Sequence, residues 1–185
     1  MKKTLCVFVF CVGLMGCCHP TRIAYVYSDF KQKDFFSNKS NLESYLPKGR
    51  VYTLSPDMKT AFVVGPRRSE SLDLDPRTIA LLSDGRCVVA PTNYGDAIIS
   101  TKRGQSKFGY YWCQNTNITI STYAGGAFNE WSGHFNDDYL EIGEILLHYK
   151  SQRKGYRYQI SPSIRFVAVN VPDAFWLNLK QCFAE

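Results

Sequence analysis

Residues Phe108 to Ile160 alternate apolar and polar side chains in short runs, and Asn, Gly, Asp and Ser interrupt these runs at nearly even intervals. A period of two residues places every second side chain on the same face of a β-strand, and the interrupting residues favour tight turns. The stretch therefore predicts an antiparallel β-meander with one apolar, aromatic face and one solvated face.

Gly143 divides this alternation into two phases. Leu140 and Ile142 are apolar at even positions, whereas Ile145 and Leu147 continue the apolar series at odd positions. A glycine inside such a strand-like run predicts a β-bulge or bend. A sheet bent in this way is expected to curl.

Two hairpins are predicted before the meander. Thr78–Leu82 and Cys87–Ala90 flank Asp84-Gly85, a dipeptide typical of two-residue hairpin turns. Arg50–Leu54 and Thr60–Val64 are expected to pair in the same way, because the Ser-Pro-Asp-Met-Lys segment between them favours a turn.

The remaining connections are predicted from their composition. Residues 65–71 and 91–107 contain several turn-forming residues and are predicted to be loops, and the second is the preferred place for a functional loop. After a last strand at Ile164–Val169, apolar residues recur at helical spacing beyond Pro172, which predicts a short amphipathic helix. These residues are Phe175, Trp176, Leu179, Cys182 and Phe183.

Together these elements place the chain in the mainly β class, as an antiparallel meander that forms a curled sheet or barrel with a short C-terminal helix. Residues 23–185 are predicted to form one domain. The segment that follows a predicted cleavage after residue 16 has 185 − 16 = 169 residues, which is enough for a single sizeable core.

The N-terminus has the features of a secretory signal peptide at residues 1–16. Lys2 and Lys3 precede an apolar run from Leu5 to Met15 that is too short to span a bilayer as a helix. Its end, Leu14-Met15-Gly16-Cys17, resembles the lipobox of bacterial lipoproteins. The resemblance implies cleavage before Cys17, acylation of that residue, and a short tether at residues 17–22. An ordinary secreted protein cut near Gly16 is the alternative.

A lipid anchor at Cys17 would hold the protein at the cell envelope, because two or three acyl chains bind a membrane stably. Cys18 follows the lipidated residue, so the Asp that commonly retains such proteins at the inner membrane is absent. We therefore expect the outer membrane, facing either the periplasm or the surface.

The charge balance does not indicate a nucleic-acid partner. The formal net charge of +6 falls to 20 − 16 = +4 once Lys2 and Lys3 are removed with the signal peptide. The remaining basic residues occur as scattered pairs, and no basic stripe is visible. The partners expected are therefore a membrane, an apolar ligand or an envelope protein.

Four cysteines remain after the signal peptide and Cys17 are set aside, namely Cys18, Cys87, Cys113 and Cys182. In an oxidising compartment a disulfide between Cys87 and Cys113 is plausible if they lie on neighbouring strands. Separate buried thiols are an equally weighted alternative, since cysteine is among the most buried residues. The CxxC spacing that is typical of a metal site is absent.

The sequence contains no catalytic motif. His134 lies close to Asp137 and Asp138, but Asn136-Asp137-Asp138 is also typical of a β-turn. No nucleophile elbow, zinc-protease motif or phosphate-binding glycine loop is present. We therefore predict no catalytic residue, no metal and no cofactor, and a protein that is not an enzyme.

Aromatic residues make up 15% of the chain and give the best candidates for a binding site. Tyr and Trp can stack on a sugar or line an apolar cavity, although use in the core is the default. If the sheet encloses a cavity, we expect its lining to include four aromatic side chains, namely Trp131, Phe135, Tyr156 and Tyr158.

Several phrases between residues 78 and 160 resemble small lipocalin-like lipoproteins of bacteria. They are the Asp-Gly turn in LLSDGRCVV, Gly-Tyr-Tyr before Asn-Ile-Thr-Ile, and Trp-x-Gly-x-Phe before Asp-Asp. The resemblance implies a curled barrel. The function expected is a lipid-anchored binding module for a small apolar ligand or an envelope lipid or glycan. The alternative is an interaction module, such as an inhibitor or assembly factor, without a small-molecule ligand.

Overall fold

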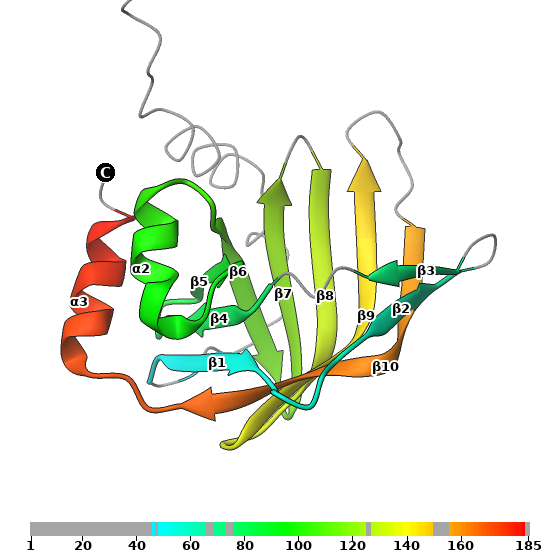
Figure 1. The fold of residues 1–185 in the computed structure, drawn as a ribbon, viewed down its shortest axis with the longest axis horizontal. Coiled ribbons are helices and arrows are strands. Elements are labelled where there is room, and N and C mark those ends of the chain that lie inside the picture. The colour runs from blue at the N-terminus through cyan, green and yellow to red at the C-terminus, as the bar shows by residue number, and fades with distance from the viewer. Residues whose placement is uncertain are drawn as a thin grey trace, which may run out of the picture.

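The computed structural model describes residues 46, 48–65, 69–72, 76–124, 127–149 and 156–183. The signal peptide, Cys17 and the tether lie outside these ranges, so they stay predictions. The elements are β1 (Arg50–Leu54), β2 (Ala61–Val64), β3 (Ser69–Leu72), β4 (Thr78–Leu81), β5 (Arg86–Ala90), α2 (Tyr94–Lys102), β6 (Lys107–Gln114), β7 (Asn117–Ala124), β8 (Ala127–Phe135), β9 (Tyr139–Tyr149), β10 (Tyr156–Val169) and α3 (Asp173–Gln181) (Figure 1).

Eight of the strands form a closed antiparallel barrel. Their order is β1-β4-β5-β6-β7-β8-β9-β10, and β10 pairs again with β1 to close the sheet. The strands β2 and β3 extend the sheet from β10 as a hairpin. The predicted mainly β fold, with its meander and C-terminal helix, is thus confirmed, and the sheet does close into a barrel.

The predicted pairing of β1 with β2 is wrong. Both strands pair with β10, one after the other along the same edge: Leu54 lies opposite Phe166, and Phe62 lies opposite Ser161. The turn signal between them is real, because the Met58 amide donates to the Ser55 carbonyl at 3.0 Å. The fourteen residues of β10 offer an edge long enough for both strands, so long-range pairing replaces the local hairpin.

Two predicted loops contain regular structure. Residues 69–72 form β3, which pairs with β2. Residues 94–102 form α2, in which Ala97 and Thr101 share one face and are buried. The turn-forming residues Pro91, Asn93 and Gly95 mark the start of this helix and not a long loop.

The bend predicted at Gly143 is confirmed. Ser132 of β8 lies opposite Glu144, but the next residue, Gly133, lies opposite Ile142, so the ladder skips Gly143. The apolar phase changes at this point, because Ile142 and Ile145 are both buried in the barrel interior. The bulge lets one strand keep its apolar side chains inside while the sheet bends.

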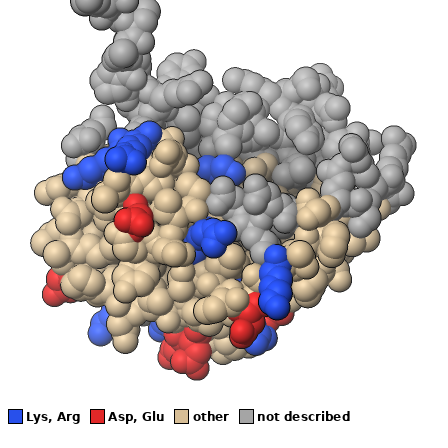
Figure 2. All heavy atoms as spheres, viewed as in Figure 1, with Lys and Arg blue, Asp and Glu red and all other residues tan. Residues whose placement is uncertain are grey.

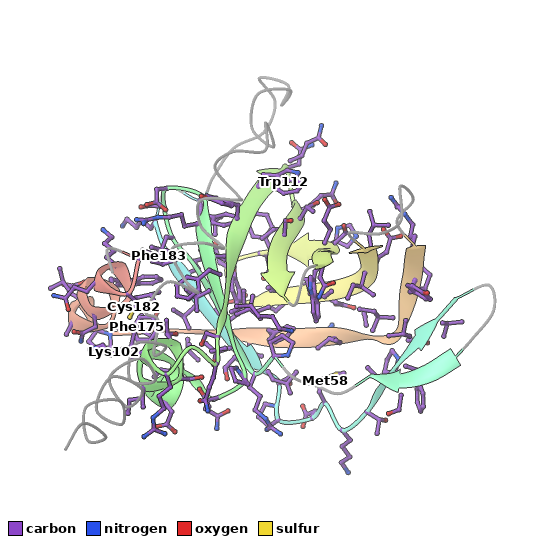
Figure 3. The ribbon with its side chains drawn as sticks, turned by 90° about the horizontal axis from the view of Figure 1, so that it is seen from above. Met58, Lys102, Trp112, Phe175, Cys182 and Phe183 are labelled. Atoms are coloured by element: carbon purple, nitrogen blue, oxygen red, sulfur yellow. The ribbon has the colours of Figure 1, made fainter. Side chains whose placement is uncertain are left out.

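The described residues form two cores. The inner core lies inside the barrel and takes residues from all eight of its strands. The outer core lies between the outer side of β1, β4, β5 and β6 and the two helices, which stand side by side against the wall (Figure 1). Phe175, Leu179 and Cys182 of the C-terminal segment are buried there, as predicted (Figure 3).

The two ends of the barrel differ. The end with the turns at 82–85, 115–116 and 136–138 is called the lower end, and the opposite end, where β6 begins, is the upper end. At the lower end the Tyr111 hydroxyl donates to the Leu82 carbonyl at 2.6 Å and accepts from the Leu46 amide at 3.2 Å. The Tyr52 hydroxyl donates to the Asn136 carbonyl at 3.2 Å. These bonds close the lower end.

Candidate functional site: the upper end of the barrel

Thr122 and Trp131 are polar residues on the inner face of the barrel near its upper end. Thr122 has the same phase along β7 as Ile118 and Ile120, which belong to the inner core. Trp131 lies on β8 opposite Ile120, which makes Thr122 its diagonal neighbour on the same face. The two side chains therefore lie close together inside the barrel.

Both residues bury a polar atom that has no hydrogen-bond partner in the described structure. Thr122 is 1% exposed and Trp131 is 6% exposed, and neither Thr122 Oγ1 nor Trp131 Nε1 is hydrogen-bonded. Such a group costs about 1–3 kcal/mol when it is buried without a partner. Thr92 and Ser121 also bury an unpartnered hydroxyl, but Ser121 has the outward phase and Thr92 precedes α2.

Lys107 and Asn129 extend this group toward solvent. Lys107 lies opposite Val89, an inner-core residue, so both are on the inner side of the sheet. Asn129 lies opposite Thr122. Both side chains are partly exposed. We call Lys107, Thr122, Asn129 and Trp131 the polar cluster.

Four apolar side chains are half-buried against the inner core on another part of the wall. They come from β1, β2, β10 and the segment between β1 and β2. We call them the apolar rim: Leu54, Met58, Val63 and Tyr158. In the closed order of eight strands, β7 is four strands from β1 in either direction, so Thr122 and Leu54 come from opposite walls of the barrel. Trp131 of β8 and Tyr158 of β10 are only two strands apart, so there the polar cluster and the apolar rim meet along one wall.

The lower half of the barrel has no space for a ligand beside its largest side chains. Tyr52, Tyr111 and Phe166 are all 0% exposed, which means that not even a water-sized void touches them. Trp131, Ile145 and Ile160 higher up retain 5–6% exposure. The described side chains therefore leave more room near the upper end than at the lower end.

The four predicted aromatic residues do not form one lining. Trp131 and Tyr158 both lie opposite Ile145, on its two sides, so the structure brings them into one row across the sheet. Phe135 lies four residues beyond Trp131, about 13 Å along the strand, and packs at the lower end opposite Leu140. The backbone of Tyr156 belongs to β10, but its side chain lies outside the described residues.

The hypothesis of a Cys87–Cys113 disulfide is corrected by the structure. Both residues are free, as is Cys182, and all three are buried. Cys87 lies opposite Gly109, and Cys113 is four residues further along β6. This offset of about 13 Å exceeds the Cα separation of about 7 Å that a disulfide can span. Burial raises the pKa of Cys87, and it raises the pKa of Cys113 to about 11.

His134 has a carboxylate beside it but lies on the outer surface. It is opposite Glu141, whose carboxylate accepts a hydrogen bond from the Ser163 hydroxyl and pairs with Arg165 at 3.2 Å. The Ser163 hydrogen bond and the Arg165 charge lower the pKa of Glu141. His134 itself is exposed. The arrangement is that of a surface ion pair, so it lends no support to a catalytic base, and the expectation of a non-enzyme stays a prediction.

Sequence reasoning found Trp131 of the polar cluster and Tyr158 of the apolar rim, but it missed the other residues of both groups. Thr122 carried a signal that could have been used: it continues the apolar phase of Ile118 and Ile120 with a polar residue. Asn129 carried the same kind of signal, because it has the phase of Trp131 and Phe135 on its strand. Lys107 carried no such signal, since it stands at the very start of its strand.

Comparison with protein-family models, with curated proteins and with solved structures gives no match to this chain. In the described ranges, no three His, Cys, Asp or Glu side chains are grouped so that they could hold a metal ion. Neither α2 nor α3, the helices that the structure describes, is long and apolar enough to cross a membrane.

Proposed function

We propose that the protein is a lipid-anchored envelope lipoprotein whose barrel binds a small, mainly apolar ligand at its upper end. The observation that carries this proposal is the pair of buried, unpartnered polar atoms on Thr122 and Trp131. Folded proteins rarely keep such groups without a reason, and a bound ligand that supplies the missing hydrogen bonds is one such reason.

The shape of the interior supports a small ligand. An eight-stranded barrel is just wide enough to be filled by side chains or to hold one small molecule. Here side chains fill the lower half, while the half-buried residues of the apolar rim offer an apolar surface at the upper end. A ligand seated there would touch the rim with its apolar part and the polar cluster with its polar part.

The anchor is proposed from the N-terminal sequence. Lys2 and Lys3, the apolar run and Cys17 match the pattern of a lipoprotein signal, and Cys18 after the lipidated residue favours the outer membrane. A tethered binding module of this kind would act on molecules of the envelope, either a lipid or a glycan.

Native mass spectrometry of the secreted protein carrying Cys17→Ser tests the binding proposal. We expect a reproducible mass excess from a co-purifying small molecule, and we expect Thr122→Val and Trp131→Phe to reduce its occupancy. Thr119→Val is the matched control, because Thr119 has the outward phase on the same strand. A bare mass for a correctly folded protein would contradict the proposal.

A protein partner is the second candidate function, and one observation favours it. Phe62 and Val64 of β2 are 43% and 44% exposed on the hairpin that leaves the barrel. Exposed apolar residues on a projecting hairpin are suited to contact another protein. This function would be supported over ligand binding if the barrel had the mass of the protein alone, without a small molecule, and a second protein co-purified with it. The Phe62→Ser variant should then fail to co-purify that second protein.

A further inference from the structure

We infer that the ligand carries an anionic head group, which Lys107 binds together with Thr122, Asn129 and Trp131. This inference rests on the proposed function and specifies the chemistry of its ligand: an amphipathic anion with a short apolar tail. The polar cluster takes the head group, and the apolar rim takes the tail.

The chemistry of the polar cluster favours an acceptor-rich group. An indole N–H and a lysine ammonium can only donate hydrogen bonds, whereas a hydroxyl and a side-chain amide can donate or accept. A carboxylate or phosphate accepts from all four, and hydrogen bonds to an ionised group are roughly twice as strong as neutral ones. A neutral alcohol or amide would leave the ammonium without a counter-charge.

Lys107 has no competing partner in the described structure. The ion pairs described there join Arg50 to Asp137, Arg86 to Asp84, Arg157 to Glu144 and Arg165 to Glu141, and all of them use arginine. The side chain of Lys107 makes no hydrogen bond or ion pair within the described residues. Its ammonium is therefore available to a ligand.

The register brings the four side chains within reach of one head group. Thr122 is the centre: Asn129 lies directly opposite on β8, and Lys107 and Trp131 are its diagonal neighbours on β6 and β8. Diagonal neighbours on one face are about 7–8 Å apart, which a lysine or tryptophan side chain can bridge.

Gly109 is the residue of β6 directly opposite Thr122, so no side chain stands between Lys107 and Thr122. A Cβ at this glycine would lie 1.9 Å from the Ser121 carbonyl oxygen, which excludes any other residue. The close approach of β6 and β7 therefore also keeps the path from the ammonium to the hydroxyl clear.

Two probes with the same tail test the inference. Binding of decanoate and decanol is measured by isothermal titration calorimetry on the full chain carrying Cys17→Ser. Each probe is compared between that protein, a Lys107→Met variant and a Lys102→Met control, since Lys102 is exposed on α2 outside the barrel (Figure 3). Thr122→Val serves as a second cluster variant that keeps the lysine.

We expect decanoate to bind at least about tenfold more tightly than decanol, because only the acid satisfies the ammonium. Lys107→Met should weaken the binding of decanoate about tenfold and leave the binding of decanol unchanged. Thr122→Val should weaken the binding of decanoate severalfold. Lys102→Met should leave the binding of both probes unchanged. Equal binding of both probes, or no effect of Lys107→Met, overturns the inference and leaves ligand binding standing. If neither probe binds, the inference and the apolar-ligand proposal both fail.

Discussion

Replacing Thr122 with Val should stabilise the protein, although Thr122 is almost fully buried. Val has nearly the shape of Thr, with a methyl group in place of the hydroxyl. The Thr122 hydroxyl has no hydrogen-bond partner in the described structure. Burying it without a partner destabilises the folded state by about 1–3 kcal/mol, and its removal relieves this destabilisation. We expect a gain of about 1–2 kcal/mol in the free energy of unfolding. For a domain of this size the melting temperature should rise by about 2–8 °C.

Thr101→Val is the matched control and should have the opposite sign. Thr101 is also buried, but its hydroxyl donates to the Ala97 carbonyl at 2.7 Å and lies 3.0 Å from the Ser106 hydroxyl. The same substitution therefore removes hydrogen bonds and should cost about 1–2 kcal/mol.

Urea denaturation followed by circular dichroism measures both variants, with equal m-values as the check that the same surface unfolds. The ligand-free protein must be used, because a ligand bound to the folded state would hide the gain. If Thr122→Val loses stability as Thr101→Val does, the Thr122 hydroxyl already has a hydrogen-bond partner within the protein. It would then not be available to bind a ligand.

Three further outcomes are expected. Tyr111→Phe should lower the free energy of unfolding by about 1–3 kcal/mol, because the Leu82 carbonyl and the Leu46 amide lose their hydrogen-bond partner. Tyr139→Phe, the control at a partly exposed tyrosine, should leave the free energy of unfolding unchanged. Equal losses for the two variants in urea denaturation would contradict this. Cys113 has a pKa of about 11, so only about one-thousandth of it should be thiolate at pH 8. Its labelling by iodoacetamide, followed by mass mapping, should be slow until the protein unfolds, and the labelling rate should rise with pH. Fast labelling of Cys113 at pH 8 would argue against its burial. Cys17→Ser should move the protein from the membrane fraction to the soluble fraction, and retention in the membrane would refute the anchor.

The elements predicted correctly are those whose signal is local. The hairpin around Asp84-Gly85, the bend at Gly143 and the apolar spacing around Phe175 and Leu179 each depend on a few neighbouring residues, and each occurs in the structure. The turn around Asp84-Gly85 is longer than the two residues predicted, because the Leu82 amide donates to the Arg86 carbonyl and three residues lie between them. The closed barrel follows from the same bend, although alternation alone does not distinguish a curled sheet from a closed one.

The errors arise where distant residues decide. β1 and β2 look like a hairpin because the Ser55–Lys59 turn is local, whereas both strands pair with residues of β10 that lie between 159 − 64 = 95 and 169 − 51 = 118 positions further along the chain. The cysteine pairing failed for the same reason, since two neighbouring strands can still hold Cys87 and Cys113 four residues out of register.

The polar cluster shows this limit most clearly. Lys107 begins a strand after a segment rich in turn-forming residues, and nothing in its neighbours reveals that it faces the barrel interior. That position follows from its register with Val89. The sequence also places charged residues at intervals along the chain, and Figure 2 shows separate basic and acidic groups on the face it presents, so charge alone does not point to the site.

The measurement that tests the account most directly is the indole N–H region of a nitrogen-correlated NMR spectrum, recorded with and without saturating decanoate. The chain has three tryptophans, and Trp131→Phe assigns the resonance of the inner one. The resonance of the Trp131 indole N–H should shift strongly as this group gains a hydrogen bond. The resonances of Trp112 and Trp176, which lie on the outer side of the barrel, should not shift. An unchanged Trp131 resonance in the saturated protein would contradict ligand binding at the upper end.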